Sequence, residues 1–191
     1  MARPKSEDKR NAILAAAIEV IAERGLAAAP TAAISRLAGV AEGTLFTYFG
    51  TKECLVNELY RAIKHELAVT SMSGFPDELD VREQLRHVWD VYVDWGVANP
   101  SARRALAQLQ VSGALTADTL AAGQAPFVRL QASVRTAMAQ DRLRVLPEAF
   151  VSAVMLSLAE TTMAAMSAHP EAAAEYRSWG FDMLWSAIEQ R

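Results

Sequence analysis

The stretch from Pro30 to Leu55 constrains the fold most strongly, because its apolar residues recur at the spacing of two short helices joined by a tight turn. The positions that would share one apolar seam are Ile34, Leu37, Ala38, Val40, Leu45 and Phe49. Gly39 supplies the sharp bend, and the second helix is expected from about Glu42 to Tyr48. This spacing predicts a helix-turn-helix over about residues 30–49, whose second helix would enter the major groove of DNA.

The polar residues of this motif have chemistry that suits DNA contacts. Thr31 follows a proline, so its hydroxyl is expected to cap the first short helix and to face an anion there. On the second helix, the residues predicted to project or open outward are Glu42, Gly43, Thr44, Thr47 and Tyr48. A helix N-terminus tolerates the negative charge of Glu42, which would accept a hydrogen bond from a cytosine N4 amine.

The motif and its flanks resemble the TetR/AcrR family of transcriptional regulators. The matching residues, over roughly the first third of the chain, are Ile13-Leu14, Ala17, Gly25, Thr31, Ile34, Ala38-Gly39-Val40, Gly43-Thr44-Leu45, Tyr48-Phe49, Lys52-Glu53 and Leu55. A helix-turn-helix pattern alone is a weak signal, but the matching first helix and the YFGTKE continuation make this one specific.

The resemblance implies a role for each matched polar residue. Thr31, Tyr48 and Lys52 would contact phosphates, and Gly43, Thr44 and Thr47 would face the bases, while Glu42 would tune sequence choice. Two positions depart from the family pattern: Ala41 stands where a Ser or Thr is frequent, and Phe46 where a Tyr is usual. Each departure removes a hydroxyl that would reach a phosphate, so fewer backbone contacts are expected.

Elsewhere the sequence favours helices, because it has no sustained period-two run and its few Gly and Pro residues punctuate long helical stretches. The chain is 52% hydrophobic and 21% charged, which suits a globular protein with a substantial core. We therefore predict an all-α fold: a helix-turn-helix DNA-binding domain of three helices within residues 7–67, then a larger helical ligand-binding and dimerisation domain over residues 68–191.

Capping residues and prolines predict where the helices begin and end. The first four expected helices outside the motif run from Ser6 to Gly25, from Thr51 to about Ser71, from Asp80 to about Gly96, and from Asn99-Pro100 to Val111. A further segment begins at Thr116. The last three helices are expected from about Phe127 to Arg142 and over roughly 147–168 and 170–190. Ser6 and Thr51 are expected to cap through their hydroxyls, and Asp80 through its carboxylate.

The net charge of −3 is unevenly distributed. Up to Lys64, nine Lys and Arg stand against seven Asp and Glu, whereas the remainder has ten against fifteen. Arg3, Lys5, Lys9 and Arg10 would form a basic arm that follows DNA, or a solvated disordered terminus. The basic part of the chain is thus the part with the motif.

Aromatic and methionine residues in the second domain would line an apolar cavity between helices or pack as an ordinary core. They are Trp89, Tyr92, Trp95, Phe127, Met138, Met155 and Met163. The family resemblance implies a pocket for a small apolar or amphipathic effector. Glu160, a carboxylate in an apolar helix, is the best candidate for a polar ligand contact, with an exposed rim or an intersubunit salt bridge as alternatives.

The last two predicted helices, roughly 147–168 and 170–190, are apolar on more than one face and therefore need partners on two sides. Burial within one bundle would satisfy them. The resemblance implies instead that they pair with their copies in a homodimer, so that two half-sites of a palindromic operator are contacted together. The segment 149–166 is the most membrane-like, but Glu160 and several Ser and Thr interrupt it, which favours a buried bundle helix.

Chemistry of other classes is sparse. His65, His87 and His169 lack metal-site spacing, and no phosphate loop, nucleophile elbow or cofactor motif is present, so neither an enzyme, a cofactor nor a metal is predicted. The single Cys54 would be a small buried hydrophobe, or a redox switch at a helix start beside Lys52. One cysteine and a charged amino terminus without a signal peptide predict a cytoplasmic protein without a membrane partner.

These features predict a homodimeric transcriptional regulator, most simply a repressor, released from a palindromic operator by a small apolar or amphipathic effector. Two other classes stay open. One is a ligand-independent DNA-binding regulator whose second domain only dimerises. The other is a helical small-molecule carrier or enzyme with a vestigial DNA module.

Overall fold

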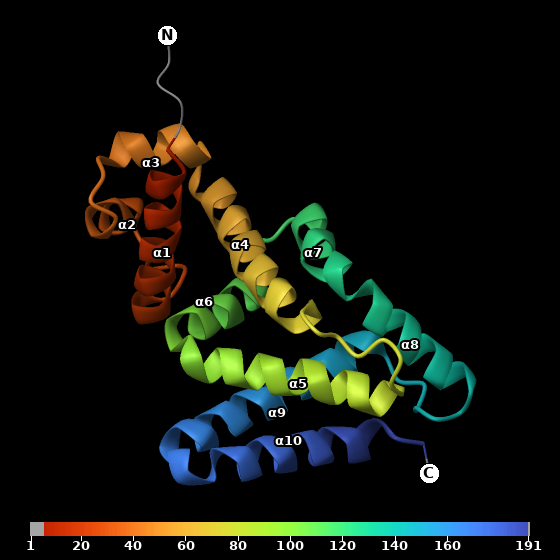
Figure 1. Ribbon diagram of the computed structural model, residues 1–191. Helices are drawn as coiled ribbons and strands as arrows, with labels where there is room; N and C mark the ends of the chain where they lie inside the picture. The colour runs from red at the N-terminus through yellow and green to blue at the C-terminus, as the bar shows by residue number, and fades with distance from the viewer. Residues whose placement is uncertain (1–5, 191) are drawn as a thin grey trace. The chain divides into compact units, whose positions relative to one another are not determined.

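The computed structural model describes residues 6–190, and these contain α-helices and short 3-10 turns but no β-strand (Figure 1). The predicted all-α fold is therefore confirmed. The chain divides into two compact units. Unit 1 comprises the residues up to Glu66 together with Asn99–Gly123, and unit 2 comprises Leu67–Ala98 together with the chain from Gln124 onward.

Unit 1 contains the helix-turn-helix. Its helices are α1 (Glu7–Arg24), α2 (Thr31–Leu37), α3 (Glu42–Phe49), the part of α4 (Lys52–Met72) up to Glu66, α6 (Pro100–Val111) and α7 (Ala117–Gln124) up to Gly123. Side chains from the first three helices that are at most 1% exposed, among them Ile13, Ile34 and Leu45, form a common core. Gly39 has a φ of 66° at the bend, which an L side chain rarely adopts. Figure 1 shows α2 and α3 beside α1.

Helix α6 packs on α1 and so belongs to unit 1, whereas the sequence placed all residues after 67 in the second domain. The Gln108 amide makes this contact specific. Its Oε1 accepts the Leu26 backbone N–H at 2.8 Å, and its Nε2 donates to the Ile21 carbonyl at 3.1 Å. The first bond satisfies the Leu26 N–H just beyond α1, and the second is additional to the Gly25 N–H that the Ile21 carbonyl already accepts.

Asn57 fixes the chain between α6 and α7 against α4. It is 7% exposed; its Nδ2 donates to the Ala114 carbonyl at 3.1 Å, and its Oδ1 accepts the Thr116 N–H at 3.0 Å. A buried amide with both ends bonded costs little to desolvate and specifies one arrangement of its neighbours.

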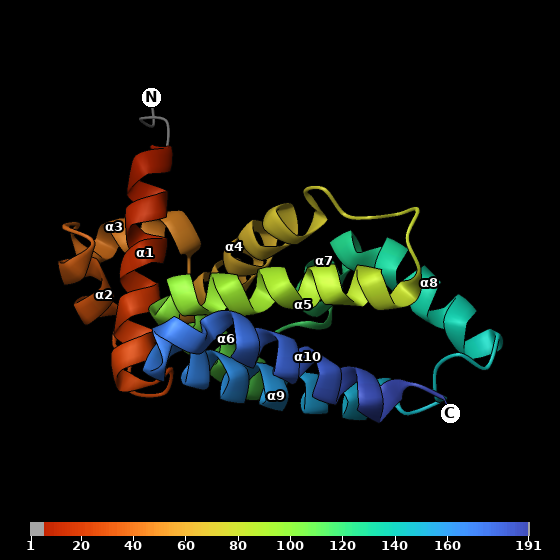
Figure 2. The ribbon, with the colours of Figure 1, turned by 60° about the horizontal axis from the view of Figure 1, so that its bottom comes forward.

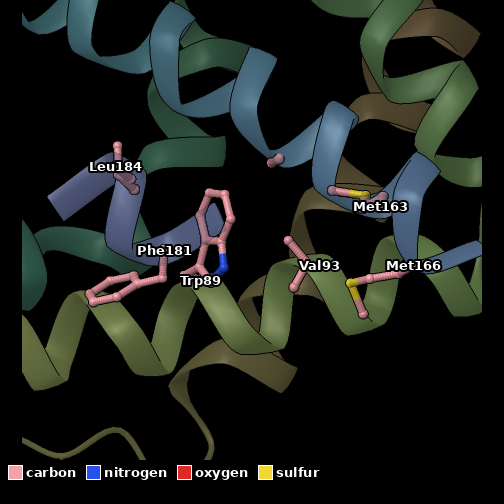
Figure 3. Packing of buried hydrophobic residues seen from close by; sticks show 7 residues of the cluster. Trp89, Val93, Met163, Met166, Phe181 and Leu184 are labelled. Atoms are coloured by element: carbon pink, nitrogen blue, oxygen red, sulfur yellow. The ribbon is translucent and has the colours of Figure 1, made fainter. Parts of the chain in front are cut away.

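Unit 2 is a helical bundle. Its elements are the end of α4 from Leu67, α5 (Val81–Ala98), the 3-10 turn η1 (Ala125–Phe127), α8 (Val128–Ala139), α9 (Glu148–Ala168), the turn η2 (Pro170–Ala172) and α10 (Ala173–Ile188). Helices α9 and α10 lie alongside each other, and α5 packs against both (Figure 2). The core between them comprises Trp89, Val93, Ala159, Met163, Met166, Phe181 and Leu184 (Figure 3).

Gly180 allows a close approach of three helices in this core. A Cβ atom at this position would lie 2.2 Å from Thr162 Oγ1 on α9 and 2.7 Å from Trp89 Cζ2 on α5. Such distances are shorter than van der Waals contact, so any side chain larger than hydrogen would force the helices or the two side chains to move.

The predicted helix boundaries agree with the structure within a few residues, with two local differences. Thr51 Oγ1 accepts the Cys54 N–H and Asp80 Oδ1 accepts the Arg82 N–H, as expected of caps. Ser6 is the N-cap residue of α1, but its hydroxyl makes no capping bond. Helix α8 ends at Ala139 and not at about residue 142, because Asp141 turns the chain at a φ of 53°.

We predict that Gly180→Ala destabilises the protein by about 1–3 kcal/mol, the usual cost of overpacking a close-packed core. Thermal or chemical unfolding monitored by circular dichroism measures this change. Adding Thr162→Ala should recover part of the loss, because it removes the closest atom. An unchanged midpoint for Gly180→Ala would show that the helices do not approach this closely.

Candidate DNA-binding site

Helix α3 has one face that is packed in the core and one face that is exposed. Leu45 and Phe49 are 0% and 6% exposed and hold the helix on the core of unit 1. Glu42, Gly43, Phe46 and Thr47 are exposed, and Thr44 and Tyr48 are half-buried. The structure therefore brings the predicted base-facing residues together on one eight-residue helix, leaving an outward surface that the fold does not use.

Thr31 does not cap α2 as the sequence predicted. The N-cap residue is Pro30, Thr31 is the first residue of the helix, and no side-chain capping bond is made. The Thr31 hydroxyl instead donates to Glu42 Oε1 at 2.6 Å, joining the start of α2 to the start of α3. A capping hydroxyl accepts a backbone N–H from the N-cap position, whereas Thr31 lies one residue later, within the helix, where its hydroxyl donates to a carboxylate.

The other two predicted phosphate contacts also bond within unit 1. The Tyr48 hydroxyl accepts the Ser6 backbone N–H at 2.8 Å, which ties α3 to the start of α1. The Lys52 ammonium donates to the Leu26 carbonyl at 3.1 Å. An ammonium has three donors, so this bond orients Lys52 and leaves donors for an anion. Local sequence signals do not indicate these partners, because they lie 42 and 26 residues away.

The predicted basic arm is only partly described. Arg3 and Lys5 lie outside the described residues, and Lys9 and Arg10 lie within α1. Arg10 Nη2 is 2.6 Å from Glu58 Oε2, and its guanidinium lies over the Phe49 ring at 6.0 Å from the centroid. Arg10 therefore stabilises the packing of α1, α3 and α4.

Gly43 faces open space. A Cβ atom at this position would meet nothing within 4 Å, so packing does not require a glycine here. The adjacent Thr47 hydroxyl donates to the Gly43 carbonyl at 2.8 Å, a bond within the helix that occupies its proton. The small surface at Gly43 would let a nucleic-acid backbone or base edge approach the helix closely.

The start of α4 adds further charge to this site. Backbone and Thr51 hydrogen bonds lower the pKa of the Glu53 carboxyl, so it remains ionised next to Lys52. Cys54 is exposed in the same turn, which differs from the expected buried hydrophobe. Exposed cations near the motif are Arg36 on α2 and, half-exposed, Lys52.

The residues predicted to bind an effector lie in unit 2, but they occupy different environments. Trp89 and Met163 belong to the closed core of Figure 3, and Trp89 Nε1 donates to the Arg177 carbonyl at 3.0 Å. Met155 and Tyr92 pack partly buried against that core, and Tyr92 stacks on the buried Trp95 at 6.4 Å. Phe127 and Glu160 are half-buried.

A pocket of about 370 Å³ lies on α9 and is lined by Ala153, Val154, Ser157, Leu158 and Thr161. None of the residues predicted to contact an effector lines it. Among the described residues, only α9 has a segment, Ala149–Ala168, that is long and apolar enough to cross a membrane, and 22% of it is buried. In this single chain, α9 packs one face in the core of unit 2 and leaves the rest half-buried or exposed, so the expected buried bundle helix is only partly buried. Phe150 on α9 and Trp179 and Met183 on α10 are further large apolar side chains that are exposed.

Comparison with known proteins agrees with this geometry. The model of the family "Bacterial regulatory proteins, tetR family" matches residues 13–59. An uncharacterised HTH-type transcriptional regulator of Bacillus subtilis, YvdT, is 36% identical over 90 residues, which are 47% of this chain and 44% of the relative. The aligned segment thus spans less than half of that relative.

Solved structures match over nearly the whole chain. A TetR-family transcription regulator from Shewanella sp. PV-4 is 25% identical with a TM-score of 0.83, covering 96% of this chain and 99% of the other. FadR from Bacillus subtilis, solved in complex with stearoyl-CoA, has the same fold at 16% identity and a TM-score of 0.69, covering 94% and 100% of the two chains.

A helix-turn-helix unit followed by a helical bundle defines a class of two-part bacterial transcription regulators. Within this class, residues 13–59 match the model of the TetR family, and the described chain has the fold of a solved TetR-family transcription regulator.

We predict that Gly43→Ala separates stability from DNA binding. The substitution should raise the free energy of unfolding by about 0.5–1 kcal/mol, because alanine favours the helix and meets no neighbour. It should also weaken DNA binding, because the added methyl group projects from the surface predicted to face the bases. Unfolding and fluorescence anisotropy on one preparation measure both quantities. Undiminished DNA affinity would contradict the role of Gly43.

Proposed function

We propose that the protein is a homodimeric, cytoplasmic transcriptional repressor that binds a palindromic operator and is released from it by a small apolar or amphipathic effector. The outward face of α3, which packing leaves unused, is the observation that carries this proposal. In a two-fold dimer, two such helices would enter successive major grooves about 34–36 Å apart.

Within the helix-turn-helix, we assign each residue by its chemistry. Lys52 and Tyr48 are oriented by bonds to Leu26 and Ser6 and would donate to phosphates. The Thr31 hydroxyl has one proton, which Glu42 accepts, so Thr31 would meet a phosphate through its backbone N–H at the start of α2. Gly43, Thr44 and Thr47 would face base edges.

The exposed apolar surface of α9 and α10 supports the homodimer. Phe150, Trp179 and Met183 are 59%, 51% and 60% exposed, although each is large and apolar. Large apolar side chains left exposed on two packed helices are unfavourable in water and are typical of an interface. Pairing of these helices with their copies would form a four-helix interface and would also cover the pocket on α9.

An effector would bind in unit 2. The stearoyl-CoA complex of FadR shows that a protein of this fold accommodates an acyl chain. In the present chain, Tyr92, Met155 and Phe127 are partly buried and would line a cavity opened by a ligand, with Glu160 as its polar contact. Release from DNA requires the effector to bind more tightly to the dimer conformation whose recognition helices do not match the half-site spacing than to the conformation whose helices match it. Helix α4, which contributes to both units, would transmit the change.

A second candidate function is a ligand-independent dimeric regulator. The closed packing of Trp89 and Met163 favours it: the two side chains are 3% and 0% exposed, so they are already buried by the protein core and leave no surface for a ligand. Thermal unfolding with a panel of fatty acids and acyl-CoA esters distinguishes the two, since only a ligand-responsive protein is stabilised.

We predict that Lys52→Ala weakens binding to all DNA and lowers the salt dependence by about one counterion per subunit, because it removes a phosphate contact. Thr44→Ala should instead reduce the preference for the operator over random DNA. Anisotropy titrations on the upstream DNA of the protein's own gene and on random DNA, at two salt concentrations, measure both effects. Equal losses on both DNAs for Thr44→Ala would contradict its role in contacting bases.

We also predict that Met183→Glu converts the dimer to a monomer, because it places a charge in the proposed apolar interface. Sedimentation velocity measures the mass, and operator affinity should fall with dimer content. Val145→Glu is the matched control, since Val145 is 82% exposed but lies outside α9 and α10. A dimer that persists in Met183→Glu would place the interface elsewhere.

A further inference from the structure

The exposed face of α3 carries an unusual set of side chains for base recognition. The helix sequence is EGTLFTYF, so it has no Arg, Lys, Asn or Gln, the residues that make paired hydrogen bonds to guanine or adenine. Its exposed residues are one carboxylate, one glycine, one phenylalanine and one threonine. Contacts from this helix must therefore use apolar groups, hydroxyls and a hydrogen-bond acceptor.

Phe46 is the large apolar group on this face. It is 40% exposed, whereas Leu45 and Phe49 are 0% and 6% exposed and anchor the helix. A phenyl ring has no hydrogen-bonding atom, so it cannot replace the phosphate contact of a tyrosine. In the major groove, the apolar feature of a base is the C5-methyl group of thymine, which phenylalanine and the threonine methyl contact favourably.

Thr47 and Gly43 extend the apolar surface beside this ring. The Thr47 hydroxyl donates its proton to the Gly43 carbonyl at 2.8 Å, which leaves no proton for a base acceptor while this bond lasts. The space at Gly43 is open for 4 Å around the position of a Cβ atom. A methyl group that projects from a base would fit beside Gly43 and contact Phe46 and Thr47.

Glu42 is an acceptor whose position is fixed. The Thr31 hydroxyl holds its Oε1 at 2.6 Å, so the carboxylate is oriented before any DNA binds. An ionised carboxylate only accepts hydrogen bonds. Cytosine offers its N4 amine without a neighbouring acceptor, whereas the N7 and O6 acceptors of guanine and the N7 of adenine would repel the carboxylate.

We propose, on the basis of the proposed DNA-binding function, that α3 reads pyrimidine edges in the major groove. Phe46 and Thr47 contact a thymine methyl group, and Glu42, oriented by Thr31, accepts from a cytosine N4 amine. Phe46 is thus a residue that determines which half-site sequence is bound, and its role goes beyond the loss of the tyrosine hydroxyl.

Selection from a random double-stranded DNA library with the full-length protein identifies a preferred site. The selected duplex is then made with thymine and with deoxyuridine, which lacks the methyl group. Wild-type protein should bind the deoxyuridine duplex roughly fourfold more weakly for each contacted methyl group, the effect of about one CH2 group. Phe46→Ala should bind the thymine duplex more weakly than wild type and lose most of the discrimination between the two duplexes.

Val111→Ala is the matched control, because Val111 is 85% exposed in unit 1 but lies outside the helix-turn-helix. It should discriminate like wild type. If Phe46→Ala binds both duplexes more weakly by the same factor, so that the wild-type ratio of the two affinities is retained, the methyl contact is overturned and Phe46 has a structural role. The unfolding midpoint of each variant shows whether it is folded under the conditions of the binding measurements.

The Glu42 contact is tested by repeating the selection with Glu42→Gln, whose amide donates as well as accepts. The selected half-site should lose a cytosine that wild type prefers, while binding to random DNA should rise because a negative charge is removed. An unchanged cytosine preference would overturn the carboxylate assignment. Failure of the wild-type protein to enrich any sequence would instead refute the proposed DNA-binding function itself.

Discussion

The burial of two side chains on an eight-residue helix governs the DNA-binding part of this protein. Helices of this length are not stable in water, because nucleation is costly and few hydrogen bonds repay it. Leu45 and Phe49 therefore hold α3 in its helical form and in its orientation, by packing in the core of unit 1. The Glu42–Thr31 and Tyr48–Ser6 bonds then fix each end of α3 relative to α2 and α1.

Local sequence signals predicted the helices well, because caps, prolines and apolar spacing act over a few residues. Thr51 and Asp80 are examples, each bonding a backbone N–H two or three residues later. The contacts that orient the proposed DNA-binding residues were not predictable in this way. Gln108 bonds Leu26 across 82 positions, and nothing near either residue indicates that α6 belongs with the amino-terminal unit.

The same limit applies to the apolar residues of unit 2. Periodicity shows that α9 and α10 are apolar on several faces, but it does not show which face meets the same chain. The structure assigns Met163 and Leu184 to the internal core and leaves Phe150 and Met183 exposed. Trp89 illustrates the converse difficulty, since an aromatic residue suited to a ligand cavity is buried against Phe181 and bonded to the Arg177 carbonyl.

The division of α3 into a packed face and an open face has an evolutionary consequence. Substitutions at Leu45 or Phe49 would be removed by selection because they cost folding stability, whereas Gly43, Phe46 and Thr47 are exposed and contribute little to the core. These outward positions are free to diverge after gene duplication while the scaffold stays intact. Paralogues with the same fold would thereby acquire new target sequences through few mutations, without passing through unfolded intermediates.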